Sequence, residues 1–318
     1  MLIIESIASI LLIFGFLQPL WADNSEIHAL FEQELKVEPD TIESLHFGLT
    51  NRNFRVAANG HEYFIRIGTD FPALLCIERD VEEKFYKMAQ ELDLVPVLIY
   101  CDTNRGIMIT PYVQGTRYGK IMGKWTGNPK EVIACIVQHM KRIHSMKAPI
   151  SHSTPYPLRV LEHYYQAGKK MGVQFPEKLS QAVDLAMTLN ISFGERVLCH
   201  HDFFWTNLLH DGKKLWIVDW EYADWDDPMY DLAGFCIKQN LNEAEREIAL
   251  REYLPCFQNE DHYKFDKMCM LYALNSSIWG FIQNKIQPDA KIDIESIAQK
   301  HLGTFWQLAN KIEADTRY

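Results

Sequence analysis

The chain changes from strand-like to helical patterning near Pro111. Before this point, short runs rich in β-branched and aromatic residues alternate with turn residues, and Asn59-Gly60 is a strong hairpin signal between two of them. A longer segment, 75–92, has helical spacing that stops before Pro96. A small antiparallel sheet with one long helix, followed by a mostly helical part, predicts an α+β fold of two lobes.

The expected elements divide into a sheet-rich N-terminal part and a helical C-terminal part. We expect residues 24–114 to form the N-terminal lobe and residues 115–318 the C-terminal lobe. The expected strands are 42–47, 54–57, 63–67, 97–101, 106–110 and 215–218. The expected helices are 27–35, 75–92, 131–146, 158–170, 176–189, 229–239, 243–253, 263–283 and 292–311.

Residues 1–23 differ from the rest of the chain. From Ser6 to Ala22 there is no charged side chain, but the Lys or Arg expected before an exported segment is missing. Three interpretations remain open: a signal-like segment, a membrane anchor formed by residues 1–22, or an extension upstream of the true start.

Charge and cysteine content exclude several classes of protein. The formal net charge of -10 argues against a nucleic-acid-binding surface, which needs clustered Lys and Arg. The seven cysteines are scattered singly, so neither a disulfide framework nor a zinc site is indicated. We therefore expect a cytoplasmic protein with reduced thiols, and an acidic surface compatible with a cationic small molecule. The oligomeric state is not predicted.

Residues 198–222 carry the strongest chemical signal. Asp202 and Asn207 lie five residues apart on a tight loop, and Asp219 follows the next strand. Phosphoryl transfer requires a carboxylate that accepts the proton of the attacking hydroxyl, together with oxygen ligands for magnesium. Asp and Asn near turns are usually caps, but the combined spacing favours chemistry here. A zinc site at His200-His201 is disfavoured because adjacent histidines point apart.

The order of these residues resembles the H-x-D-x-x-x-x-N and I-D-x-E signatures of the choline kinase and aminoglycoside phosphotransferase family. The resemblance covers about residues 40 to 285 and implies the two-lobed protein-kinase fold, with ATP as cosubstrate. It implies that Asp202 is the catalytic base and that Asn207 and Asp219 bind Mg2+. His200 would hold the loop in place. The family does not carry the apolar N-terminal segment, and His201 stands at a position that varies.

Upstream residues resemble the nucleotide-binding part of the same family. The segment Gly48-Leu49-Thr50-Asn51-Arg52-Asn53-Phe54-Arg55-Val56 is similar to the G-x-T-N-x-N-[FY]-x-V turn of choline kinases. Such a turn can bind phosphates through backbone and side-chain donors, and no Walker P-loop is present. The residues implied in ATP binding are Thr50, Asn51, Asn53, Arg66 in place of the kinase lysine, its partner Glu82, and Tyr112 in the hinge.

The acceptor is predicted from aromatic and acidic side chains. Aromatic faces beside a carboxylate bind quaternary ammonium groups, although aromatic residues at helical spacing are more often core. The predicted acceptor-site residues are Glu221, Tyr222, Trp225 and Trp279. We predict an ATP- and Mg2+-dependent kinase that converts choline to phosphocholine, with ethanolamine, thiamine or aminoglycosides as alternative acceptors. A kinase-fold binding protein without catalysis is disfavoured by the intact Asp202, Asn207 and Asp219.

Overall fold

A computed structural model describes residues 24–45, 48–148, 154–256 and 258–315 of the 318-residue chain. The apolar segment at residues 1–23, and with it the predicted membrane anchor at residues 1–22, lies outside these ranges. Within them, no helix combines the length and the apolar character that crossing a membrane requires.

The N-terminal lobe contains one antiparallel sheet with the strand order β1-β2-β3-β5-β4. Asn59 (φ 50°) and Gly60 (φ 74°) join β2 to β3, and both have the positive φ that a two-residue hairpin turn favours. The strands are β1 (Thr41–Leu45), β2 (Arg52–Ala58), β3 (His61–Ile67), β4 (Tyr100–Asp102) and β5 (Ile107–Pro111), and the helical segments are α2 (Asn24–Leu30), η1 (Phe31–Leu35), η2 (Ala73–Leu75) and α3 (Arg79–Glu91).

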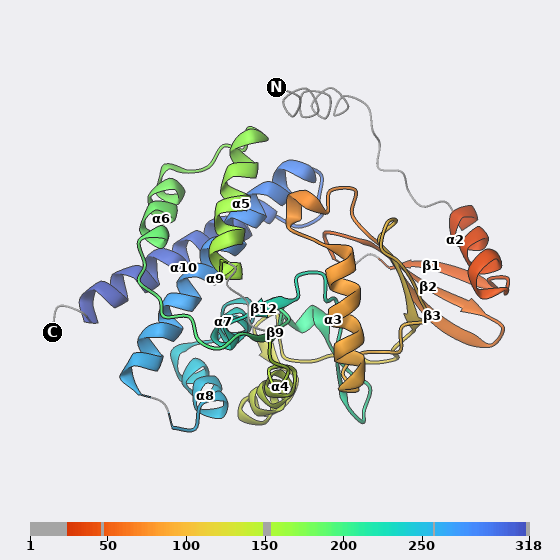
Figure 1. Cartoon of the computed structure of the whole chain (residues 1–318), viewed down its shortest axis with the longest axis horizontal. Coiled ribbons are helices and arrows are strands. Elements are labelled where there is room, and N and C mark those ends of the chain that lie inside the picture. The colour runs from red at the N-terminus through yellow and green to blue at the C-terminus, as the bar shows by residue number, and fades with distance from the viewer. Residues whose placement is uncertain (1–23, 46–47, 149–153, 257, 316–318) are drawn as a thin grey trace.

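The two faces of this sheet have different roles. Because successive side chains of a strand point to opposite faces, alternate residues of β2, β3 and β5 form an apolar layer under α2 and η1. This layer contains Ile27, Leu30, Phe31, Phe54, Val56, Ile65, Ile67, Ile107 and Ile109. The opposite face carries Asn53, Arg66 and Met108, and Arg66 contacts α3. The sheet therefore presents its polar side chains to the helix that lies next to the other lobe (Figure 1).

The C-terminal lobe is built around the long helix α9, which packs against α5, α6, α7 and α10 (Figure 1). Buried residues lie on all sides of α9 between Phe265 and Gln283, as expected of a central helix. The helices are α4 (Pro129–Ile143), α5 (Tyr156–Lys170), α6 (Glu177–Met187), α7 (Pro228–Lys238), α8 (Glu243–Tyr253), α9 (Asn259–Ile286) and α10 (Ile294–Asp315). The short elements are β6 (Thr116–Arg117), β7 (Lys120–Ile121), β8 (Lys124–Trp125), β9 (Val197–Cys199), η3 (Trp205–Asn207), β10 (Leu208–His210), β11 (Leu215–Ile217) and β12 (Asp224–Asp226).

The two lobes share a hydrophobic core. Phe85 of α3 packs edge-on against Trp225 of β12, with ring centroids 5.2 Å apart. The backbone N–H of Ile217 in β11 donates to the carbonyl of Leu94, which follows α3, at 2.9 Å. Helix α3 therefore belongs by sequence to the N-terminal lobe but packs into the core of the C-terminal lobe.

The α+β arrangement of two lobes predicted from the sequence is confirmed, with differences in detail. The predicted helix 75–92 is two segments, because Cys76 adopts a left-handed conformation (φ 58°) and α3 begins only at Arg79. The predicted strand 97–101 is shorter and begins at Tyr100. The strands β9, β10 and β12 were not predicted, because three residues are too few to show an alternation of apolar and polar side chains.

Candidate active site

The loop between β9 and η3 holds Asp202 in a fixed position. The side-chain amide of Asn207 donates to the Asp202 carboxylate at 2.7 Å and to the Asp202 carbonyl at 3.1 Å. The Asp202 side chain keeps 20% of its surface exposed. A carboxylate that is held in orientation yet partly exposed to solvent can receive the proton of a substrate hydroxyl.

Asp231 of α7 anchors this loop from behind. Its two carboxylate oxygens accept hydrogen bonds from the backbone N–H groups of His200 (2.8 Å) and His201 (2.6 Å). His144 Nε2 also lies 3.1 Å from the carboxylate. Burial alone would raise the pKa of Asp231, but the hydrogen bond from His144 and the nearby histidines hold it below its ordinary value.

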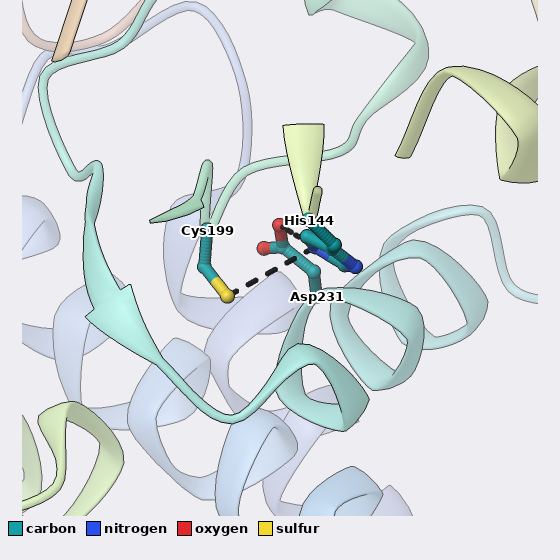
Figure 2. A group of neighbouring side chains, drawn as sticks. All are labelled: His144, Cys199 and Asp231. Carbon is teal, nitrogen blue, oxygen red and sulfur yellow. Dashed lines mark hydrogen bonds and ion pairs between the residues drawn. The ribbon is translucent and has the colours of Figure 1, made fainter. Parts of the chain in front are cut away.

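Figure 2 shows Asp231 beside His144 and Cys199, a group of side chains whose geometry could suit a metal ion. Both oxygens of Asp231 are already engaged with the backbone of the loop. Burial raises the pKa of the Cys199 thiol well above its ordinary value, which disfavours the thiolate that a metal needs. His144 is further held by Tyr253, whose hydroxyl lies 2.7 Å from Nδ1. We therefore assign this group to holding the catalytic loop.

His200 connects the loop to the strand that precedes Asp219. Its Nδ1 accepts from the backbone N–H of Asp202 at 3.2 Å, so Nε2 carries the proton that it donates to the carbonyl of Val218 at 3.1 Å. Burial lowers the pKa of His200, which keeps the ring in the neutral form that these two contacts require. The position of Asp202 is thus tied to the position of Asp219.

Asp219 lies just after β11 in a left-handed backbone conformation (φ 69°). Burial raises the pKa of its carboxyl well above the ordinary value, and the negative charges of Glu221 and Asp202 add to this although Arg66 opposes it. Within the described ranges, the buried Oδ1 atom of Asp219 has no hydrogen-bond partner. An unpartnered carboxylate oxygen among like charges fits a divalent cation, which Asp219 and Asn207 would hold through oxygen atoms.

Arg66 and Glu82 form a buried ion pair between β3 and α3. Both terminal nitrogens of Arg66 donate to the Glu82 carboxylate, one of them at 2.9 Å. Burial by itself would weaken both charges, but the pair raises the pKa of Arg66 and lowers the pKa of Glu82. The Nε atom of Arg66 is buried and has no hydrogen-bond partner in the described part of the chain. The guanidinium is therefore fixed in orientation and keeps N–H donors that Glu82 does not use, the Nε–H among them.

A second arginine, Arg79, joins the two lobes at this point. Its guanidinium contacts Glu82 at 2.8 Å, Glu221 at 3.3 Å and the Asn51 side chain at 3.1 Å. Asn51 in turn donates to Glu221 at 2.8 Å. Sequence analysis did not identify Arg79, although its place three residues before Glu82 puts both side chains on one face of α3.

These contacts bring together residues that were predicted for different ligands. Asn51 was predicted to bind ATP and Glu221 the acceptor, yet they bind each other. Burial raises the pKa of the Glu221 carboxyl, while Arg79 and Asn51 act in the opposite direction. Glu221 is 4% exposed, so its carboxylate contributes to the joint between the lobes.

The other residues predicted to bind ATP lie in the N-terminal sheet or beside it. Asn53 is buried and stands directly opposite Arg66 in the pairing of β2 with β3. Thr50 lies in the turn before β2. Tyr112 follows β5; its backbone N–H donates to the carbonyl of Glu62 at 2.9 Å, and its ring lies 4.8 Å from the guanidinium carbon of Arg55.

The predicted acceptor-site aromatics are only partly brought together. The indole N–H of Trp279 donates to the hydroxyl of Tyr222 at 3.1 Å, so these two form a pair. Trp225 instead packs against Phe85 in the shared core. The described structure thus contains one aromatic pair, Tyr222 and Trp279, that joins α9 to the segment after Asp219.

Known proteins resemble this chain in both sequence and structure. Residues 41–265 match the phosphotransferase enzyme family. Protein LicA of Haemophilus influenzae is 22% identical over 283 residues, which cover 83% of this chain and 79% of LicA. The structure of choline kinase LicA from Streptococcus pneumoniae has a TM-score of 0.70 at 19% identity, covering 90% of this chain and 100% of that one. An ethanolamine kinase of Plasmodium vivax has a TM-score of 0.71 at 15% identity, covering 95% and 93%.

The family match spans most of the chain, from β1 to α9, and includes Asp202, Asn207 and Asp219. This confirms the family that was predicted from the motifs. The solved structures have the same arrangement of lobes over almost the whole chain. The chain therefore belongs to the phosphotransferase enzyme family and is a small-molecule kinase with a two-lobed, protein-kinase-like fold.

Proposed function

We propose that this kinase transfers the γ-phosphoryl group of ATP to the hydroxyl of a small amino alcohol, with choline as the preferred acceptor. The observation that carries the proposal is the arrangement of Asp202, which is oriented by Asn207 and open to solvent. Asp219, whose pKa is raised by burial and by the charges of Glu221 and Asp202, provides an unpartnered oxygen for a cation. This is the set of groups that phosphoryl transfer to a hydroxyl requires.

Each residue has a defined part in the proposed reaction. Asp202 accepts a hydrogen bond from the acceptor hydroxyl and takes its proton as the new bond to phosphorus forms. Asn207 and Asp219 would hold magnesium, which when bound offsets the negative charge of the phosphates. Arg66, fixed by Glu82, offers its positive charge and the N–H groups that Glu82 does not use to the nucleotide.

Three observations support an amino alcohol as the acceptor. The structures with the same fold include proteins named as a choline kinase and an ethanolamine kinase. The aromatic pair Tyr222 and Trp279 offers ring faces of the kind that attract an ammonium group. The formal net charge of -10 favours a cationic ligand over an anionic one. Ethanolamine and thiamine also combine a hydroxyl group with a positive charge, and they are the nearest alternatives.

The test is ADP release by the purified full-length chain with ATP and magnesium, using choline, ethanolamine, thiamine and kanamycin as acceptors. We expect choline to give the highest kcat/KM. Asp202→Asn should lower kcat about 10²- to 10⁴-fold, because it removes the group that accepts the proton. Asp184→Asn, which changes an exposed aspartate of α6, is the matched control and should keep wild-type turnover.

Two results would contradict the proposal. If Asp202→Asn folded normally and retained near-wild-type turnover, Asp202 would not be the base. If the wild type bound ATP with magnesium but released no ADP with any acceptor, the alternative of a kinase-fold binding protein without catalysis would gain support.

A further inference from the structure

A lysine, Lys238, reaches the catalytic carboxylate from the end of α7. Its Nζ atom lies 3.4 Å from Oδ1 of Asp202, and its side chain is 24% exposed. The other oxygen of Asp202 receives the hydrogen bond from Asn207. Lys238 therefore faces the carboxylate oxygen that Asn207 leaves available to an acceptor.

Two aromatic rings complete the surroundings of this ammonium group. Nζ of Lys238 is 5.5 Å from the ring centroid of Phe204 and 5.7 Å from that of Trp279. Both distances are within the range of about 6 Å over which a cation is attracted to a ring face. A carboxylate and two ring faces are the groups that would bind the ammonium of an amino alcohol. The protein's own lysine already occupies them.

The position of Lys238 is set by the helix that anchors the loop. Asp231 and Lys238 are seven residues apart, about two turns of α7, so both lie on one face of the helix. A cation at the C-terminal end of a helix is also favourable on its own account. The helix-end effect alone would not require the Lys238 side chain to extend to Asp202 and Trp279. In this structure the side chain reaches both.

Choline would meet this lysine at close range. Only two carbons separate the hydroxyl oxygen of choline from its charged nitrogen. A hydroxyl bound to Asp202 therefore brings that nitrogen close to Nζ of Lys238. Two positive charges a few ångströms apart in a partly buried site repel each other strongly.

We propose that Lys238 is a specificity-determining residue: its ammonium competes with a cationic acceptor for the position beside Asp202, and so weakens the preference for cationic over uncharged acceptors that the carboxylate and the ring faces would otherwise give. This inference rests on the proposed function in one respect, namely that the acceptor hydroxyl binds at Asp202. It adds that a positive charge of the protein itself limits how strongly a cationic acceptor such as choline is preferred.

The experiment compares choline with its uncharged carbon analogue, 3,3-dimethylbutan-1-ol, by calorimetric titration of the full-length chain. Lys238→Met should tighten choline binding about tenfold, or about 1.4 kcal/mol, and leave the Kd of the analogue unchanged. Lys238→Arg keeps the charge and should keep the wild-type ratio of the two Kd values. Lys300→Met is the matched control, because Lys300 is exposed on α10 and, like Lys238, acts electrostatically on His301.

The ratio of the Kd of choline to the Kd of the analogue shows whether Lys238 acts on the charge of the acceptor. If Lys238→Met changes both ligands equally or neither, Lys238 only stabilises the end of α7 and the proposal is wrong. If neither ligand binds any variant, the acceptor does not bind at Asp202 and the proposal also fails. Failure of the proposed function would give a different result: the wild type would bind choline but not phosphorylate it. The ratio of the two Kd values would then still measure the effect of Lys238 on binding.

Discussion

At the scale of single residues, Asp219 shows a conflict between stability and chemistry. Its carboxylate is surrounded by the charges of Glu221 and Asp202, and burial is the main reason that its pKa is raised. An acid whose pKa is higher in the folded state than in the unfolded state costs stability when it is ionised. Functional sites commonly retain such costs because the chemistry needs the group.

Asp219→Asn should therefore stabilise the ligand-free protein while abolishing turnover. We expect the free energy of unfolding at pH 7 to rise, because asparagine removes a buried charge that stands among like charges. Asparagine tolerates the left-handed backbone of this position, so the substitution adds no strain. Urea unfolding with and without magnesium and ATP measures both effects. The wild type should gain more stability from the ligands than the variant.

The pH dependence gives a second measurement of the same prediction. As the pH falls through the folded-state pKa of Asp219 towards the unfolded-state value of about 3.9, the native carboxyl takes up a proton and its cost disappears. The stability difference between Asp219→Asn and the wild type should shrink over that window. A variant that is less stable than the wild type at pH 7 would show that the charge of Asp219 is already compensated within the protein.

The site could be predicted from the sequence only where local spacing determines the contact. Asp202 and Asn207 are five residues apart, and the loop brings them to hydrogen-bond distance. Arg79 contacts Glu221 across 142 residues, and Lys238 of α7 contacts Asp202 of the catalytic loop. Both contacts depend on the tertiary packing. The contact of Glu221 with Asn51, across 170 residues, is likewise a tertiary effect.

At the scale of elements, the packing of α9 against α10 depends on Gly280. A Cβ atom added there would lie 2.9 Å from Cβ and 3.3 Å from Cα of Ala298. Gly303 of α10 is also helical, but an added Cβ would meet nothing within 4 Å. The two glycines therefore provide a matched pair, one at the contact of two helices and one on an exposed surface.

The same substitution at these two positions should have opposite effects. Gly280→Ala should destabilise the protein by about 1–3 kcal/mol, because the two helices must separate. Gly303→Ala should stabilise it by about 0.5–1 kcal/mol, because alanine loses less backbone entropy in a helix. Chemical unfolding followed by circular dichroism gives both values. Equal effects at the two positions would mean that α9 and α10 do not pack as closely as described.

The elements themselves were predictable to different degrees. The long helices have enough turns to show their periodicity, and the predicted 243–253 coincides with α8 (Glu243–Tyr253). Its capping box, formed by Asn242 and Glu245, is also a local signal. The strands β9 and β12 pair only because β12 returns beside the catalytic loop. Such short pairings are decided by the tertiary fold and leave no pattern in the sequence.

At the scale of the whole molecule, the lobes are joined by buried contacts as well as by the chain. Phe85 and Trp225 pack together, and the hydroxyl of Tyr164 in α5 donates to the carbonyl of Leu75 at 3.0 Å. One hydrophobic core contains α3 and most of the C-terminal helices. A shared core couples the unfolding of its parts.

The two lobes should therefore unfold in a single transition. Phe85→Ala should lower the midpoint of that transition, at a cost of about 3–5 kcal/mol, and keep it single because the lost contacts belong to both lobes. Differential scanning calorimetry, with hydrogen exchange in β3 and α9 as local probes, measures this. Two resolved transitions in the wild type, or exchange in β3 that is independent of exchange in α9, would contradict the shared core.

The anchoring of the catalytic loop by α7 has a consequence for how such an enzyme diversifies. Asp231 holds the backbone of the loop through the N–H groups of His200 and His201, and these bonds do not involve the Asp202 side chain. Lys238, two turns along the same helix, contacts the Asp202 carboxylate and takes no part in that anchor. If Lys238 acts as proposed, a substitution at the end of α7 would alter the choice of acceptor and leave the anchor of the catalytic loop unchanged.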